Sequence, residues 1–365
     1  MTAKPLKVSQ LKVHWSLKES TQRLIESVVP TLQIAIAATA AYLLAHLGLG
    51  HQIPLLAVTV TITSLGFSRD ARPRRIAQTA LGMVTGIALS ELLLNTLGQG
   101  VWQMSVILFA VLLAARFLTG SAAFALAAGT QSMLVYLLPA PIGGPFMRSI
   151  DGIVGGLVAL AVTALIPRDP RGIANKDATK LFEVFMESVE ALKLALRTSD
   201  VKTADAALSK VRRTQPLVDN WRLSLDSAIA ISRISPFLRK YRDELRGQVR
   251  LMRGMDLATR NLRVVVRRID FLLRDAKPRP YLADLMDQIS EATELLLAGV
   301  EEPERLDQAQ ELLVELIHQL DPKKFGIADQ LREASVLLLL RPLVVDLLCA
   351  SGMPEEEARA ELPVI

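Results

Sequence analysis

The sequence predicts an all-α protein in which a six-helix transmembrane bundle is followed by a cytoplasmic α-helical domain. Of the 365 residues, 51% are hydrophobic, and the mean hydropathy is +0.33. Residues 1–167 contain five acidic residues and eleven Lys or Arg, whereas residues 168–365 contain 32 acidic and 31 basic residues. We therefore expect a cytoplasmic N-terminal segment at 1–29, a transmembrane domain at 30–167 and a cytoplasmic helical domain at 168–365.

Six apolar segments in the first half are candidate membrane spans. A helix needs roughly 20 apolar residues to cross the hydrocarbon core, which is about 30 Å thick. The expected spans are 30–47, 53–67, 76–97, 101–118, 121–138 and 149–166. An arrangement with five spans, in which the short segment 53–67 is fused with a neighbour or omitted, is the main alternative.

The distribution of Lys and Arg favours six spans with both termini in the cytoplasm. Basic residues collect on the cytoplasmic side of membrane proteins. With the N-terminus inside, the inner segments hold thirteen Lys and Arg, whereas the outer loops 48–52, 98–100 and 139–148 hold only Arg148. Five spans would not preserve this segregation. We expect a multi-pass protein of the plasma membrane, and the lone Cys349 fits a reducing compartment for the second half.

Two further patterns concern packing and the membrane surface. Small residues recur at interface spacing in the third and sixth spans, where they allow close approach of helix backbones within one bundle or, alternatively, in a dimer. These residues are Gly82, Gly86, Gly152, Gly155 and Gly156. A basic loop precedes the third span, where it fixes the topology and is suited to binding anionic lipid head groups. This loop contains Arg69, Arg72, Arg74 and Arg75.

The stretch from Gly66 to Pro167 resembles the fusaric-acid-resistance-like (FUSC) family of integral membrane transporters, which includes aromatic acid exporters. The resemblance rests on SRDARPRRIAQTALGMVTGIALSELLLNTLGQGVWQ (68–103), QSMLVYLLPAP (131–141) and GGPFMRSIDGIVGGLVALAVTALIPRDPR (143–171). It implies export of organic acids, aromatic carboxylates among them. Long family members look like two six-span units, so the resemblance also implies that two copies of this chain assemble into a homodimer.

Two carboxylates, Glu91 and Asp151, lie inside the expected spans, where charge is costly and usually faces a cavity or a partner, and Arg148 directly precedes the sixth span. Glu91 lies about two turns from the outer end of the third span; it either reaches the interface or acts as a proton-exchanging or gating carboxylate paired with Arg148. Arg148 and Asp151 share one helix face. They either clamp the outer end of the bundle, or Arg148 binds the carboxylate of a substrate.

Uncharged polar residues give weaker candidates for a substrate or ion path. Gln131 lies in the middle of the fifth span, where hydrogen bonding between helices and substrate contact explain it equally well. Thr59 and Thr61 belong to the second span, which is short and lies between Pro54 and Gly66. Short, interrupted spans often mark binding sites in transporters. A plain short helix that extends into the preceding loop is the alternative interpretation.

The second half shows helical periodicity interrupted by prolines. The expected helices are 175–198, 201–231, 236–276, 280–299, 303–320 and 328–350. Within the last of these, 336–349 is too short to span and is expected to form the buried core. An Arg row on 236–276 and an acidic row on 280–299 predict an antiparallel hairpin, for example with Arg274 opposite Asp284.

No enzyme signature emerges from the sequence, and no metal or cofactor is expected. His and Cys residues lack the spacing of metal ligands, and there is no P-loop or nucleophile elbow. A gradient-driven transporter of small organic anions is therefore the first hypothesis, in contact with membrane lipid and not with nucleic acid. The alternatives are a membrane-anchored scaffold whose second half recruits partners, and a channel or barrier protein without a dedicated substrate.

The topology is testable with single cysteines in a Cys349→Ser background. Because 139–148 is expected to face outward, a Gly144→Cys variant should react with an impermeant thiol reagent in intact cells. An Asp70→Cys variant should react only after the cells are permeabilised, since the Arg-rich loop faces inward. The opposite labelling pattern would contradict the arrangement with six spans.

Overall fold

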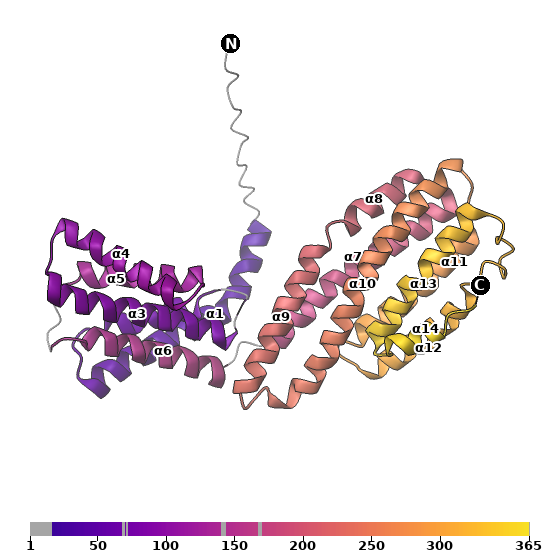
Figure 1. Ribbon diagram of the computed structural model, residues 1–365. Coiled ribbons are helices and arrows are strands. Elements are labelled where there is room, and N and C mark those ends of the chain that lie inside the picture. Colours follow the sequence, from indigo (N-terminus) through magenta and orange to yellow (C-terminus); the bar gives the residue numbers. More distant parts are fainter. Residues whose placement is uncertain (1–16, 68–69, 71, 140–143, 167–169, 365) are drawn as a thin grey trace, which may run out of the picture. The chain divides into compact units, whose positions relative to one another are not determined.

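The chain is helical throughout the residues that its computed structural model describes (Figure 1). The described residues are 17–67, 70, 72–139, 144–166 and 170–364. Every regular element within them is a helix, which confirms the all-α prediction. Contacts divide the chain into two compact units. The first unit comprises Met1–Ser68 and Pro73–Arg168, and the second comprises Arg69–Arg72 and Asp169–Ile365.

The first unit is a bundle built from the apolar segments. Helix α1 (Leu17–Leu43) continues directly into a π-helical turn, η1 (Leu44–Gly48). The other helices are α2 (Leu55–Leu65), α3 (Pro73–Leu97), α4 (Val101–Leu118), α5 (Ala122–Leu137) and α6 (Met147–Leu165). Helix α3 lies between the α4–α5 pair and α6, and α2 packs against α6 (Figure 1).

Helix α4 shows how this bundle meets its surroundings. Its side chains Ile107, Val111 and Ala115 are fully buried. The large apolar side chains on its outer face are exposed instead: Val106, Phe109, Leu113 and Phe117. An exposed apolar stripe along a whole helix is stable in lipid but not in water. The chain is a multi-pass membrane protein.

Among the described residues of the first unit, four helices are long and apolar enough to cross a membrane by themselves. They comprise residues Ser27–Gly48, Pro73–Leu97, Val101–Leu118 and Met147–Leu165. Helix α2 has 11 residues and α5 has 16, which at 1.5 Å per residue reach roughly 16 and 24 Å. Each expected span contains a helix, but six complete crossings remain a prediction.

The glycines of α3 and α6 are used for packing within this bundle. A Cβ at Gly82 would lie 2.7 Å from the carbonyl oxygen of Phe124, and one at Gly86 would collide with the carbonyl oxygen of Ala128. A Cβ at Gly155 would collide with the carbonyl of Ala57 in the same way. Gly152 and Gly156 face Ile87 and Ala80 of α3. The small residues therefore set the α3–α5, α2–α6 and α3–α6 separations.

The second unit is a bundle of amphipathic helices. Its long members are α7 (Pro170–Thr198), α9 (Gln215–Ile234), α10 (Arg242–Leu272), α11 (Pro280–Ala298), α12 (Glu304–Gln319) and α13 (Leu331–Ser351). The short ones are α8 (Val201–Val211), η2 (Arg239–Tyr241), η3 (Leu273–Asp275) and α14 (Glu355–Ala360). The single helix expected at 201–231 is wrong, since α8 ends at Val211. Pro216, which has no backbone N–H, lies in the first turn of α9, where prolines are tolerated.

The predicted hairpin between the Arg row and the acidic row is also wrong. Helix α10 packs mainly against α13, and α11 packs against α7. The acidic residues of α11 therefore meet bases of α7: Arg197 Nη2 contacts Asp284 at 3.1 Å and Asp287 at 2.8 Å. Arg274 of η3 pairs with Asp270 in the last turn of the adjoining α10. The matching spacing of the Arg row and the acidic row did not determine which helices pack together, because the apolar faces of the helices did.

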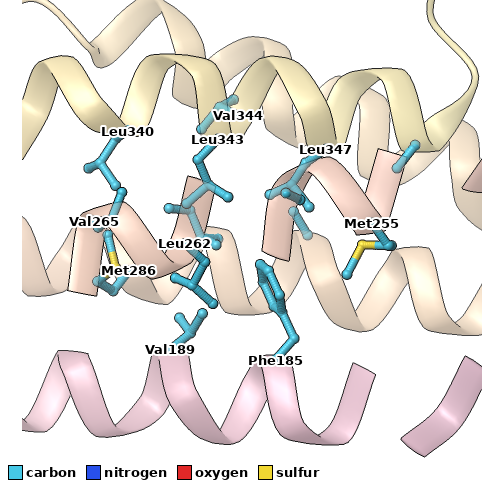
Figure 2. Packing of buried hydrophobic residues seen from close by; sticks show 14 of the residues in the cluster. Phe185, Val189, Met255, Leu262, Val265, Met286, Leu340, Leu343, Val344 and Leu347 are labelled. Atoms are coloured by element: carbon cyan, nitrogen blue, oxygen red, sulfur yellow. The ribbon is translucent and has the colours of Figure 1, made fainter. Parts of the chain in front are cut away.

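Helix α13 is long and apolar enough to span a membrane, contrary to the expectation that its apolar part is too short. Its apolar side chains nevertheless form the centre of the second unit, as expected. Figure 2 shows Leu262 of α10 between Val189 of α7 and Leu343 of α13. All three side chains are fully buried. Burying such side chains contributes about 1.5–3 kcal/mol each.

A substitution at Gly86 tests the close contact between α3 and α5. Gly86→Val should lower the unfolding temperature in detergent, because overpacking costs typically 1–3 kcal/mol. Gly120→Ala is the matched control, since no atom lies within 4 Å of its added Cβ. Heating followed by fluorescence-detected size exclusion measures both variants. Equal stability of Gly86→Val and the wild type would contradict the contact.

Burial in the second unit shifts the titration of one carboxyl group on α13. Burial raises the pKa of Asp346 to about 6, Asn261 lowers it by donating a hydrogen bond at 2.5 Å, and Glu355 raises it. The folded pKa thus lies above the unfolded value. This group binds more protons in the folded state between about pH 4 and pH 6. Its ionisation therefore destabilises the second unit progressively as the pH rises through this window.

We predict that Asp346→Asn stabilises the second unit by about 1–3 kcal/mol at pH 8 and by much less near pH 4. Trp221 reports unfolding of this unit once Trp15 and Trp102 are replaced by Phe. The exposed Asp329→Asn variant is the control and should leave the melting temperature unchanged at both pH values. A stabilisation by Asp346→Asn that does not depend on pH would contradict the raised pKa.

Candidate functional site

Ionisable side chains gather where α6 begins. We call this group the α6-start cluster; it comprises His51, Glu91, Arg148, Ser149 and Asp151. The residues come from the loop before α2, from α3 and from the first five residues of α6. Phe146 precedes α6 in a left-handed conformation, with φ of 66°, and supplies no side-chain cap. The free backbone N–H groups at the start of α6 thus need other partners.

Glu91 supplies one of these partners. Its Oε2 accepts hydrogen bonds from the backbone N–H of Ser149 at 3.2 Å and from the Ser149 hydroxyl at 2.5 Å. The positive end of the α6 dipole also favours a carboxylate there. Glu91 is only 5% exposed. The side chain of Glu91 therefore points into the bundle. It does not reach the membrane–water interface, which was one of the two interpretations of the sequence.

Arg148 caps the C-terminal end of a helix, α5. Its guanidinium donates to the carbonyl oxygens of Val135 at 3.0 Å and Leu138 at 3.3 Å, and also to that of Pro139. These carbonyls lie at the C-terminal end of α5, which carries partial negative charge. Among the described residues no carboxylate pairs with Arg148. The expected clamp between Arg148 and Asp151 is wrong, and so is a direct ion pair between Arg148 and Glu91.

Asp151 pairs with a residue that the sequence interpretation did not consider. His51 Nδ1 lies 2.5 Å from Asp151 Oδ1, and the two side chains are only 8% and 7% exposed. His51 is one of the histidines that lack metal-ligand spacing, so the sequence alone does not single it out. The sequence does contain a clue to this pair. A carboxylate inside an apolar helix needs a partner, and a histidine lies in the short loop before α2.

The π-helical end of α1 positions His51. The backbone N–H of His51 donates to the carbonyl of Ala45 at 3.2 Å. The carbonyl of His51 accepts from Nδ1 of His46 at 2.7 Å, so His46 carries its hydrogen on Nδ1. Tyr42 stacks on His46, with ring centroids 5.4 Å apart. The loop is thereby tied back to the turn that precedes it, and π-helical turns often occur at functional sites.

The other polar candidates lie outside this cluster. Thr61 donates to the carbonyls of Ala57 and Gly155 and so bridges α2 and α6, whereas Thr59 bonds only within α2. Between α3 and α5, the hydroxyl of Ser90 donates to that of Ser132 at 2.5 Å. Next to it, Gln131 is buried, and no described residue forms a hydrogen bond with its Oε1. An unpaired buried acceptor of this kind is uncommon and marks a site where a donor can bind.

The basic loop before α3 is partly described. Arg72 forms a two-pronged ion pair with Asp70, with both N–O distances at 2.8 Å. Arg74 is exposed, and Arg75 is half-buried near the start of α3. Arg69 lies outside the described residues. Within the described part of the chain, no group of three or more His, Cys, Asp or Glu side chains is placed to hold a metal ion.

Comparisons with known proteins relate much of the first unit to a known family. Residues 36–162 match the family model of fusaric acid resistance protein-like proteins, as the resemblance implied. An uncharacterized protein of Corynebacterium glutamicum is 28% identical over 358 residues, covering 95% of this chain and 91% of that protein. Proteins of Mycobacterium tuberculosis and Mycobacterium bovis named "Putative arylamide transporter" are 28% identical over 155 residues. That match covers 41% of this chain and 44% of those proteins.

Proposed function

We propose that this chain, whose residues 36–162 belong to the fusaric acid resistance protein-like family, is a secondary transporter that exports small organic anions across the plasma membrane. Membrane transport as such is supported by the family match and by the apolar helices. Aromatic carboxylates are the substrates that we favour. All members of the α6-start cluster lie inside the matched residues.

One observation carries the proposed substrate class. Arg148 is a half-buried cation in a membrane bundle, and its hydrogen-bond partners are three neutral carbonyl oxygens. No carboxylate of the described residues forms a direct ion pair with it, although Glu91 attracts it electrostatically. A guanidinium without a directly paired carboxylate is well suited to bind the carboxylate of a substrate, because its planar fork matches both oxygens. Nearby aromatic and apolar surfaces would accommodate the ring of an aromatic acid.

A shallow groove of about 510 Å³ lies beside the end of α5 that Arg148 caps. It is lined by residues that include Met104, Tyr136 and Pro139. Tyr136 ties the groove to the start of α4, because its hydroxyl donates to the carbonyl of Gly100 at 2.7 Å. Its largely apolar walls suit the ring of an aromatic acid, and Arg148 caps the adjacent helix end without itself lining the groove.

The proposal is tested with the purified chain in liposomes and a panel of labelled aromatic carboxylates, including benzoate and phthalate. Arg148→Gln should raise the apparent KM at least about tenfold, since it removes the cation that attracts the carboxylate. The control is Arg116→Gln, because Arg116 also caps a helix end through a backbone carbonyl, that of Gly120. Absence of transport for every panel member, or equal KM values for the two variants, would contradict the proposal.

A second candidate function is a membrane-anchored scaffold whose second unit recruits partners. One observation favours it: the outer face of α10 combines exposed Arg residues with exposed apolar ones. The basic residues are Arg246, Arg250, Arg253, Arg260, Arg267 and Arg274, and the apolar ones are Leu257, Val264 and Phe271. If the scaffold role is correct, substitutions on this face should abolish the cellular phenotype of the protein while Arg148→Gln leaves it intact.

A further inference from the structure

We propose that the His51–Asp151 pair is the proton-carrying site that couples transport to the proton gradient. The proposal rests on the proposed transport function and assigns to it two residues and a coupling ion. Imidazole and carboxylate groups can each bind a proton, both side chains are almost fully enclosed by protein, and they share one short hydrogen bond.

The chemistry of the pair suits reversible binding of one proton. Neutral His51 with ionised Asp151 carries one negative charge, and uptake of a proton makes the pair neutral overall. That proton resides either on the imidazole or on the carboxyl group, and the hydrogen bond between them allows both. Charge in a poorly hydrated site is costly, so the two forms differ strongly in how they interact with a nearby anion.

The other ionisable groups near this pair are less suited to reversible proton binding. Glu91 is held by two hydrogen bonds from Ser149 at the start of α6. Arg148 remains a cation at any physiological pH. Helix α2 contains no ionisable residue, and α1 contributes only Tyr42 near this end. His46 is engaged with the backbone of His51.

The position of the pair also fits a coupling role. Asp151 is on α6, two residues after Ser149 and three after Arg148. A change of charge at the pair therefore changes the electrostatic potential at Arg148, the proposed anion-binding residue. His51 belongs to a short loop in which Gly50 adopts φ of 73°. A loop segment can change its contact with a rigid helix more easily than two packed helices can. Proton binding at the pair can therefore alter both the electrostatics of the substrate site and the attachment of the loop.

The test separates proton coupling from substrate binding in liposomes with the full-length chain. The probe is radiolabelled phthalate, or the panel member that the wild type transports fastest. Wild-type protein should accumulate the probe when a pH gradient is imposed across the membrane, and it should also exchange the probe between compartments of equal pH. Asp151→Asn and His51→Gln should lose accumulation at least about tenfold but retain exchange within about threefold.

The exposed pair His318–Glu361 of the second unit supplies the control, since it has the same chemistry at 2.7 Å but lies at the surface. His318→Gln should leave accumulation unchanged. Unchanged accumulation in both Asp151→Asn and His51→Gln would overturn the proposal. Parallel loss of exchange and accumulation in these variants would also overturn it and would assign the pair a structural role. Failure of the wild type to exchange any panel member would instead contradict the proposed transport function.

A second measurement does not depend on a substrate. In an Asp346→Asn background, which removes the carboxyl group whose pKa is raised to about 6, infrared difference spectra of the purified protein between about pH 5 and pH 9 should contain a band of a protonated carboxyl group. The band should disappear in Asp151→Asn, shift in His51→Gln and persist in Glu91→Gln. A band that disappears in Glu91→Gln but persists in Asp151→Asn would overturn the assignment of the proton site.

Discussion

The first unit is governed by the lack of hydrogen-bonding partners in hydrocarbon. Every buried charge must be compensated by protein groups, and helix ends are the available partners because their N–H and C=O groups are free. Glu91 satisfies the start of α6, and Arg148 satisfies the end of α5. Both contacts depend on the close packing of α3 against α5 and α6, which Gly82, Gly86 and Gly152 allow. The His51–Asp151 pair is held in the same region by the turn at the end of α1.

This arrangement explains why one end of the bundle is suited to transport. A cation that only neutral carbonyls contact attracts an anion, and a titratable pair a few residues along the same helix can change the local charge by one unit. Neither feature requires nucleotide hydrolysis. The polar seam of Ser90, Ser132 and Gln131 between α3 and α5 supplies further hydrogen-bonding groups inside the bundle.

The sequence predicted the features that depend on local composition. Apolar runs located the helices of the first unit, the small-residue spacing at Gly82 and Gly86 identified close helix contacts, and the intramembrane residues Glu91, Arg148 and Asp151 marked the region of the cluster. The pairings were not predictable, because they depend on which helices pack together. Arg148 meets the end of α5 instead of Asp151, and His51 reaches Asp151 across 100 residues of chain. In the second unit, the apolar faces directed α10 to α13, and the acidic row of α11 consequently met α7. Membrane topology and dimer formation stay predictions.

The central claim is that the loop residue His51 contacts Asp151 within the membrane bundle. In a Cys349→Ser chain with a protease site inserted at Gly144, His51→Cys and Asp151→Cys lie on different fragments after cleavage. A short bifunctional thiol reagent should keep these fragments joined on a denaturing gel until the link is cleaved. The control combines Asp151→Cys with Thr130→Cys, an exposed position on α5, and its fragments should separate. We predict that the fragments stay joined only in the chain that combines His51→Cys with Asp151→Cys. Separation of the fragments in both combinations would contradict the contact between His51 and Asp151.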